Sequence, residues 1–211
     1  MPWRELLVRI SKAFSVANRS SRGLLRRIAK KNEDKMDHVD MGKLIGLLKV
    51  RVRRGVNLAV RDAVSETSDP YVVVSVESQK LKTRVIHNDC NPYWNDELTL
   101  TISDPSLPIK LTVYDKDTLT DDDKMGRAEF DIRPYLECLQ MGLGKLPIGT
   151  AVKKIQPDKG NHLADESKVI WIGDGKMVQD MVLKLQDVER GLVQIQIEWV
   201  DVLIEPKPGE S

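Results

Sequence analysis

The chain has 211 residues, of which 41% are apolar and 31% charged, a composition typical of a globular protein with a real core. Two cysteines are too few for a disulfide framework and favour a reducing compartment. No apolar run approaches the ~20 residues that a membrane-spanning helix needs.

The net charge of +1 conceals an uneven distribution. Residues 1–31 contain nine Arg or Lys and one acid, a net +8, which leaves −7 for the remaining 180 residues. Apolar side chains such as Trp3, Leu6, Ile10 and Phe14 recur at helical spacing in this arm. A basic amphipathic helix is therefore predicted, and three interpretations stay open: a membrane-surface segment, an organelle transit peptide, or a poorly ordered tail.

From residue 43 onward the periodicity changes from helical to β. Leu48, Val50 and Val52 alternate with Lys and Arg, the pattern of a half-buried strand. Similar alternation predicts the next strands at residues 71–76, 80–86, 97–102, 109–114 and 127–132. Many short alternating strands separated by turns indicate an all-β, antiparallel sandwich, here of about eight strands.

A segment at about residues 134–188 exceeds what such a sandwich needs. The residue pattern in this segment predicts a short helix at 134–141 and strands at 150–155, 168–172 and 177–185. A last strand is predicted at 192–200. Its apolar run at 169–172 must be buried, so we expect a small α/β insert that packs on the sandwich as a second lobe. The predicted organisation is an arm and linker at 1–42, a domain at 43–205 and a tail at 206–211.

The chemistry concentrates where the strand at 109–114 ends. Five aspartates lie within nine residues there: Asp115, Asp117, Asp121, Asp122 and Asp123. Aspartates two apart at a strand end lie on the same side and repel. A hard cation with six to eight oxygen ligands relieves that repulsion, and Ca²⁺ suits a flexible loop better than Mg²⁺. The alternative is a solvated acidic turn. An EF-hand is excluded, because Leu119 and Thr120 stand where its loop needs a ligand and Gly.

Another acidic loop, residues 61–70, follows the first strand and precedes the aspartate-rich loop in the chain. We call it the first acidic loop. Two such loops can meet at one end of a sandwich and share a cation. The predicted metal ligands are Asp62, Asp69, Asp115, Asp117 and Asp123.

Three motifs agree with this arrangement and occur in one order: Ser68–Val72 (SDPYV), Asn91–Asn95 (NPYWN), and Tyr114–Asp117 (YDKD) followed by Asp123–Gly126 (DKMG). They resemble the signature of a C2 domain, the calcium-dependent phospholipid-binding β-sandwich. Residues 43–203 resemble more closely the small plant C2-domain abscisic-acid-related proteins. Further segments carry that resemblance: GLLKVRV at 46–52, LADES at 163–167 and VQDMVL at 178–183.

The resemblance implies a calcium-dependent phospholipid-binding adaptor that recruits abscisic-acid receptors to the cytoplasmic face of the plasma membrane, with the cytosol and nucleus as further locations. The alternative it implies is a GTPase-activating protein for a small or unconventional GTPase. Two features depart from the family. The first acidic loop is about two residues longer, so Glu66 can replace Asp62 as a ligand, and the arm at 1–31 lies outside the usual family chain.

Two sets of residues suit a lipid surface. Lys80, Lys82 and Arg84 share one face of a predicted strand and suit anionic inositol-lipid headgroups, although a basic face can also serve solubility alone. Val64 and Leu119 lie at predicted loop tips, where a docking loop carries apolar residues. Single exposed apolar residues are also common without a function.

The predicted insert offers a surface for a protein partner. Leu146, Lys153 and Lys154 combine apolar and basic side chains there. The resemblance to the family implies that this insert binds the receptor. The alternative is a structural cap over a sheet edge.

An enzyme is the least supported class. The three histidines, His38, His87 and His162, have no nucleophile or metal-ligand spacing beside them, and no Gly-rich phosphate loop exists. The expected partners are an anionic phospholipid membrane, abscisic-acid receptors and, for the alternative, a GTPase, with no nucleic acid.

Overall fold

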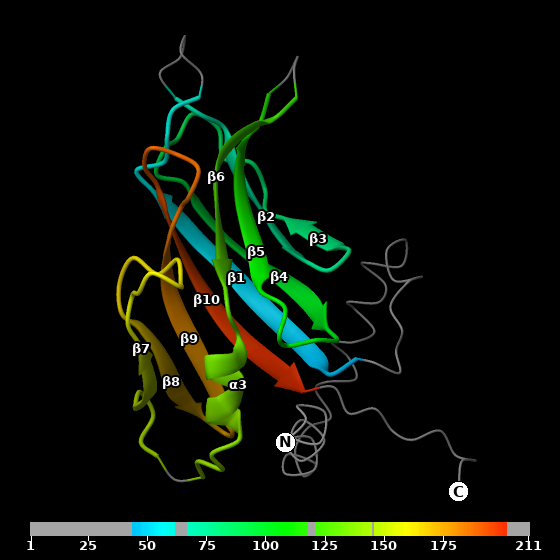
Figure 1. The fold of residues 1–211 in the computed structure, drawn as a ribbon, viewed down its shortest axis with the longest axis vertical. Coiled ribbons are helices and arrows are strands. Elements are labelled where there is room, and N and C mark those ends of the chain that lie inside the picture. Colours follow the sequence, from blue (N-terminus) through cyan, green and yellow to red (C-terminus); the bar gives the residue numbers. More distant parts are fainter. Residues whose placement is uncertain (1–43, 62–66, 118–120, 145, 202–211) are drawn as a thin grey trace, which may run out of the picture.

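The computed structural model describes residues 44–61, 67–117, 121–144 and 146–201. The arm and four of the predicted site residues lie outside this range: Asp62, Val64, Glu66 and Leu119. The described chain forms two antiparallel β-sheets and one short helix (Figure 1). The predicted antiparallel sandwich is therefore confirmed.

The larger sheet has six strands in the order β4-β1-β10-β9-β8-β7. Their bounds are Tyr93–Ile102 (β4), Gly46–Val56 (β1), Leu192–Asp201 (β10), Lys176–Lys184 (β9), Ser167–Gly173 (β8) and Ala151–Ile155 (β7). The smaller sheet has four strands in the order β3-β2-β5-β6. Their bounds are Gln79–Lys82 (β3), Pro70–Val76 (β2), Ile109–Asp115 (β5) and Asp123–Phe130 (β6).

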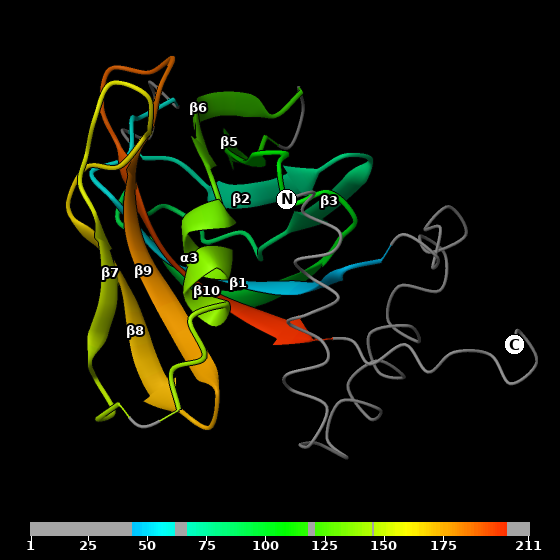
Figure 2. The same cartoon turned by 60° about the horizontal axis from the view of Figure 1, so that its bottom comes forward.

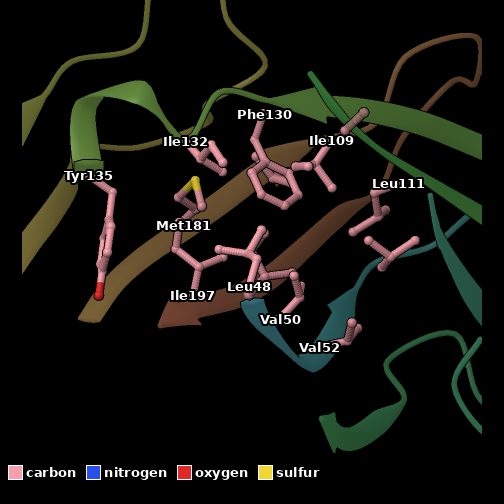
Figure 3. Close-up of a cluster of buried hydrophobic side chains, with 14 of the residues drawn as sticks. Leu48, Val50, Val52, Ile109, Leu111, Phe130, Ile132, Tyr135, Met181 and Ile197 are labelled. Atoms are coloured by element: carbon pink, nitrogen blue, oxygen red, sulfur yellow. The ribbon is translucent and has the colours of Figure 1, made fainter. Parts of the chain in front are cut away.

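The core lies between the two sheets. Alternate residues of each strand point inward, because successive side chains of a strand face opposite sides. In β1, Leu48, Val50 and Val52 are completely buried, and Val50 is directly opposite Ile197 of β10. Figure 3 shows these side chains facing Ile109, Leu111 and Phe130 of the smaller sheet. Trp94 is also fully buried.

The helix α3 (Arg133–Leu139) follows β6 directly and begins with a proline in its first turn, which needs no backbone N–H there. Its buried face packs against β7 and β9, in a region that the four-stranded sheet leaves open (Figure 2). The Tyr135 hydroxyl donates to the Met177 carbonyl over 2.5 Å and accepts from the Trp199 N–H over 3.1 Å. Tyr135 thereby connects α3 to β9 and to β10.

The insert packs with the sandwich as expected, but it does not form a second lobe. Strands β7 and β8 continue the six-stranded sheet, so the described residues contain ten strands rather than about eight. Val169 and Trp171 of the apolar run belong to the same core cluster as β1. The insert is thus a lateral extension of the sandwich, since β9 pairs with β10 and β8 pairs with the other edge of β9.

Two strand boundaries also differ from the predictions. The third strand ends at Lys82 instead of residue 86, although the Thr83 N–H still donates to the Val72 carbonyl over 2.9 Å. The sixth strand begins at Asp123 instead of residue 127. Asp123 is therefore a strand residue, held opposite Asp115 by the β5–β6 pairing.

Candidate metal and membrane site

The described parts of the two acidic connections, β1–β2 and β5–β6, lie at the same end of the sandwich, at the top of Figure 1. The β9–β10 loop reaches this end too, whereas α3, β7 and β8 lie toward the other. The topology therefore brings together loops that are distant in the sequence.

Asp69 and Asp115 join the ends of β2 and β5. The Asp69 N–H donates to Asp115 Oδ1 over 2.5 Å, and the Lys116 N–H donates to the Asp69 carbonyl over 3.0 Å. The antiparallel register, which pairs Pro70 with Asp115, makes these contacts possible. Two of the predicted ligands are thus adjacent.

Asp115 is a buried carboxyl, only 4% exposed. Burial raises its pKa, and the nearby charges of Asp117 and Asp69 raise it further, while hydrogen bonds from Asp69 and Ser68 act in the opposite direction. A buried carboxylate beside two others is an environment of oxygen donors that a hard divalent cation stabilises. The chemistry of these side chains therefore suits a hard divalent cation such as Ca²⁺.

The carboxylate of Asp69 also contacts the β3–β4 connection. The Asn88 N–H donates to Asp69 Oδ1 over 2.8 Å, and His87 Nδ1 lies 2.7 Å from Asp69 Oδ2. A third loop is therefore bonded to the same carboxylate. The sequence does not predict this contact, because His87 and Asp69 are distant along the chain.

Asp122 has a role that was not predicted from the sequence. Its Oδ1 accepts from Lys116 Nζ over 2.7 Å and from the Asp117 N–H over 3.1 Å, and its Oδ2 accepts from the Tyr71 hydroxyl over 2.6 Å. The bonds from Lys116 and Tyr71 lower the Asp122 pKa to about 2. Asp122 thus fixes the β5–β6 loop against β2, while its neighbour Asp123 is exposed.

The predicted ligand set is only partly brought together. Asp69, Asp115, Asp117 and Asp123 lie on the ends of β2, β5 and β6 and the loops beside them, whereas Asp62 lies outside the described residues. Within the described part of the chain, no group of three carboxylate, histidine or cysteine side chains has the arrangement of a metal site.

The predicted basic face divides into two parts. Lys80 and Lys82 are exposed, and Lys82 Nζ lies 5.8 Å from the ring centre of Tyr71. Tyr71 in turn stacks on Tyr114, with 5.5 Å between ring centres. This part of the face is open to a ligand from solvent.

Arg84, the third predicted lipid-binding residue, is instead bonded to β4. Its Nη2 donates to the carbonyls of Tyr93 and Trp94, and its Nε lies 3.7 Å from Asp96 Oδ1. These bonds cover backbone groups of an edge strand, so Arg84 has a structural role that the sequence alternation did not reveal.

The three residues of the predicted partner surface all contact other parts of the fold. Leu146 is half-buried against the core. Lys153 forms an ion pair with Glu137 of α3, and Lys154 Nζ lies 3.3 Å from Glu166 Oε1. By contrast, the side chain of Ile148 is 77% exposed.

In the described ranges, no helix is long and apolar enough to span a membrane.

Comparison with known proteins identifies the sandwich. The family model described as C2 domain matches residues 46–145. The solved structure of the paired C2 domains of Extended-Synaptotagmin 2 with calcium bound superposes with a TM-score of 0.51 at 18% identity, covering 74% of this chain and 46% of that chain. This likeness shows the C2 fold.

Two relatives extend the match through the insert. "Protein C2-DOMAIN ABA-RELATED 5" of Arabidopsis thaliana is 58% identical over 162 residues, which cover 77% of this chain and 80% of that protein. "GTPase activating protein 1" of Oryza sativa subsp. japonica is 56% identical over 162 residues, covering 77% of this chain and 96% of that protein. The chain therefore belongs to the plant family of C2-domain ABA-related proteins.

Proposed function

We propose that this protein is a calcium-dependent phospholipid-binding adaptor that docks on the membrane with its acidic end. The observation that carries the proposal is the buried Asp115 carboxyl bonded to the Asp69 N–H, with two other carboxylates acting on it. In the absence of a cation this cluster is electrostatically unfavourable, so it gains stability when a divalent ion binds.

Five carboxylates are proposed to hold the ion: Asp62, Asp69, Asp115, Asp117 and Asp123. Glu66 is the substitute for Asp62 in the lengthened first loop. Bound Ca²⁺ supplies positive charge at this end of the sandwich and attracts anionic phospholipid. The role of Asp122 is to hold the loop, because its oxygens already accept three hydrogen bonds.

The membrane contact is proposed to include basic and apolar residues. Lys80 and Lys82 project from the exposed edge strand β3 and attract anionic headgroups, each worth about 1 kcal/mol near a charged surface. Val64 and Leu119, from the two acidic loops, are proposed to enter the interfacial region of the bilayer. The site of action is then the cytoplasmic face of the plasma membrane, with cytosolic and nuclear pools.

The adaptor role extends the membrane proposal to a protein partner. The family name refers to abscisic acid, and we infer that this chain recruits abscisic-acid receptors through the insert, with Leu146, Lys153 and Lys154 at the contact. The insert lies toward the end of the sandwich opposite the acidic loops, which leaves it accessible when those loops face a bilayer.

Liposome co-sedimentation tests the proposal. The full chain is mixed with vesicles of phosphatidylcholine and phosphatidylserine, in calcium and separately in chelator. We expect the protein in the pellet only with calcium and only with the anionic lipid. Equal sedimentation in chelator would contradict the calcium dependence, and no sedimentation in calcium would contradict membrane docking.

A second candidate function is GTPase activation in a partner, because a rice relative 56% identical to this chain carries that name. The same C2 domain would then serve for location, and an arginine could act in the partner's site. Measuring GTP hydrolysis by a candidate GTPase with and without this chain separates the two functions. An unchanged rate leaves the adaptor function in place.

A further inference from the structure

Arg61, the last described residue before the first acidic loop, is bonded to three other parts of the chain. Its N–H donates to Ser68 Oγ over 3.0 Å. Its Nε donates to the Lys124 carbonyl over 3.2 Å, and its Nη2 lies 3.4 Å from Glu189 Oε2. The side chain is only 27% exposed, so most of it is held within the protein.

These bonds connect backbone segments next to two proposed ligands. Arg61 directly precedes Asp62, and Lys124 directly follows Asp123. The two segments extend from different sheets, since Arg61 follows β1 and Lys124 is in β6. The Arg61 side chain therefore fixes the base of the first acidic loop relative to the β5–β6 loop.

Ser68 closes the other end of the first loop. Its hydroxyl accepts the Arg61 N–H and also contacts Ala59, and its bond to Asp115 partly opposes the burial that raises the pKa of that carboxyl. Residues 61 and 68 are thus held together at the base of the loop, beside the buried Asp115.

Glu189 offers Arg61 a fixed partner, because the β9–β10 loop is itself anchored to β6. The Arg127 N–H donates to the Gln186 carbonyl over 3.0 Å, and the Gln186 N–H donates back over 2.7 Å. Gly126 has φ +114°, and a Cβ there would lie 2.6 Å from Val188 Cγ1. The loop therefore packs on β6 so closely that only glycine fits.

We propose that Arg61 is a positioning residue for the cation site: it sets the separation of the two acidic loops and thereby the affinity and the ion-size preference of the site. The inference rests on the proposed function, because the cation site belongs to that function. Its physical basis is that several carboxylates gathered around one ion repel, so their loops need support from outside the ligand set. Groups that orient metal ligands typically change affinity by about 10-fold or more when they are removed.

The guanidinium is suited to this task because its geometry is fixed. It presents several N–H donors in one plane, and Arg61 uses two of them on different segments. A lysine at this position keeps the charge but cannot make both bonds with the same geometry. The charge and the bonding geometry can therefore be separated by substitution.

Metal titration of the full chain, with the metal alone and no lipid, tests the proposal by calorimetry. We expect Arg61→Met to weaken Ca²⁺ binding about 10-fold. Binding of the larger Sr²⁺ should weaken less, because loosened loops accommodate it, so the ratio of the Sr²⁺ and Ca²⁺ dissociation constants falls. Arg61→Lys should show the same lowered ratio as Arg61→Met, because lysine keeps the charge but not the bonding geometry. An unchanged ratio in Arg61→Met, or a wild-type ratio in Arg61→Lys, would overturn the proposal.

Arg127→Met is the matched control. Arg127 forms an ion pair with Asp187 in the same β9–β10 loop, whereas the side-chain bond to the Lys124 carbonyl belongs to Arg61. We expect this variant to keep the wild-type Sr²⁺ to Ca²⁺ ratio. The same change of ratio in both variants would mean that general loop anchoring, and not Arg61, sets the site.

A measurement without calcium separates this inference from the proposed function. In chelator, amide hydrogen exchange at positions 61 and 69 should be slow in the wild type and faster in Arg61→Met, while exchange in β1 and β10 stays unchanged. Unaltered exchange at both positions would contradict the positioning role. A wild-type chain that binds no Ca²⁺ would overturn the proposed function, and with it the cation part of this inference.

Discussion

The Asp69 N–H donates a hydrogen bond to Asp115 Oδ1 over 2.5 Å, and this bond connects the residue before β2 with the last residue of β5. The two charges that act on the buried Asp115 carboxyl, Asp117 and Asp69, are both negative. This repulsion supports the proposed cation site, whose carboxylates should then behave as a unit.

Replacing Asp115 and Asp117 together by Asn should abolish calcium-dependent sedimentation with anionic liposomes. Asn keeps the side-chain oxygen that accepts the Asp69 N–H but removes both charges. The calcium-free melting temperature should rise by a few degrees, because a buried, repelled carboxylate is removed. Asp131→Asn, a carboxylate paired with Arg133 outside the acidic loops, is the control. An unchanged calcium titration in the double variant would remove Asp115 and Asp117 from the site.

The open part of the basic face gives a second prediction. Lys80→Gln with Lys82→Gln should weaken binding to anionic vesicles by about 2 kcal/mol, roughly 30-fold, and reduce its dependence on salt. The melting temperature should change little, because both side chains are exposed.

Arg84→Ala is the contrasting variant on the same face. It removes the donors to the Tyr93 and Trp94 carbonyls, so it should lower the melting temperature while vesicle binding by the folded protein persists. If Arg84→Ala instead weakens binding as much as the lysine pair and leaves stability intact, Arg84 contacts lipid.

The bonds around Asp122 predict a pH dependence. The folded-state pKa of Asp122 is lowered to about 2, mainly by the bonds from Lys116 and Tyr71. The ionised group therefore stabilises the fold fully above the ordinary carboxyl pKa near 4, and this contribution is lost as pH falls through about 2. Asp122→Asn should cost about 1 kcal/mol at pH 7, or roughly 2–4 °C in melting temperature, with the difference closing between about pH 4 and pH 2. A difference that stays constant over this range would mean that charge is not the cause.

The strand pattern was predictable because it depends on local alternation. Leu48, Val50 and Val52 alternate with polar residues in the sequence, and the fold buries these three. The acidic residues were equally visible, since Asp115 and Asp117 follow a strand directly. Both features require only neighbouring residues and the period of a strand.

The remaining features depend on contacts between distant residues. The Gly-Asp-Gly sequence at 173–175 predicts a hairpin turn, and β8 and β9 do pair across it. Nothing near Lys168 indicates that this hairpin joins the large sheet, because strand register is decided by the whole core. Likewise, Arg84 looks like any exposed basic residue until β4 lies beside it. Asp122 looks like one more member of the acidic run until Tyr71 of β2 reaches its carboxylate. Such roles follow from the fold and not from local pattern.

The last prediction concerns the partner surface. Replacing Lys153 and Lys154 by Glu and Leu146 by Ala should weaken capture of an abscisic-acid receptor, while calcium-dependent lipid binding persists. These three side chains also support the fold, because Lys153 is paired with Glu137 and Lys154 with Glu166, and Leu146 contacts the core. Loss of binding in this triple variant can therefore come from a loosened α3 and β7.

Ile148→Ser resolves that ambiguity. The Ile148 side chain is 77% exposed in the same insert, so its replacement should change the free energy of unfolding by less than about 0.5 kcal/mol. If the insert is the contact, receptor capture falls in both variants, because an exposed apolar side chain gains most from burial at an interface. If only the triple variant loses capture and its melting temperature also falls, the insert supports the fold and the receptor binds elsewhere. Full capture by both variants would mean that the receptor binds outside the insert, because neither the charge of the insert nor its exposed apolar side chain would then be needed.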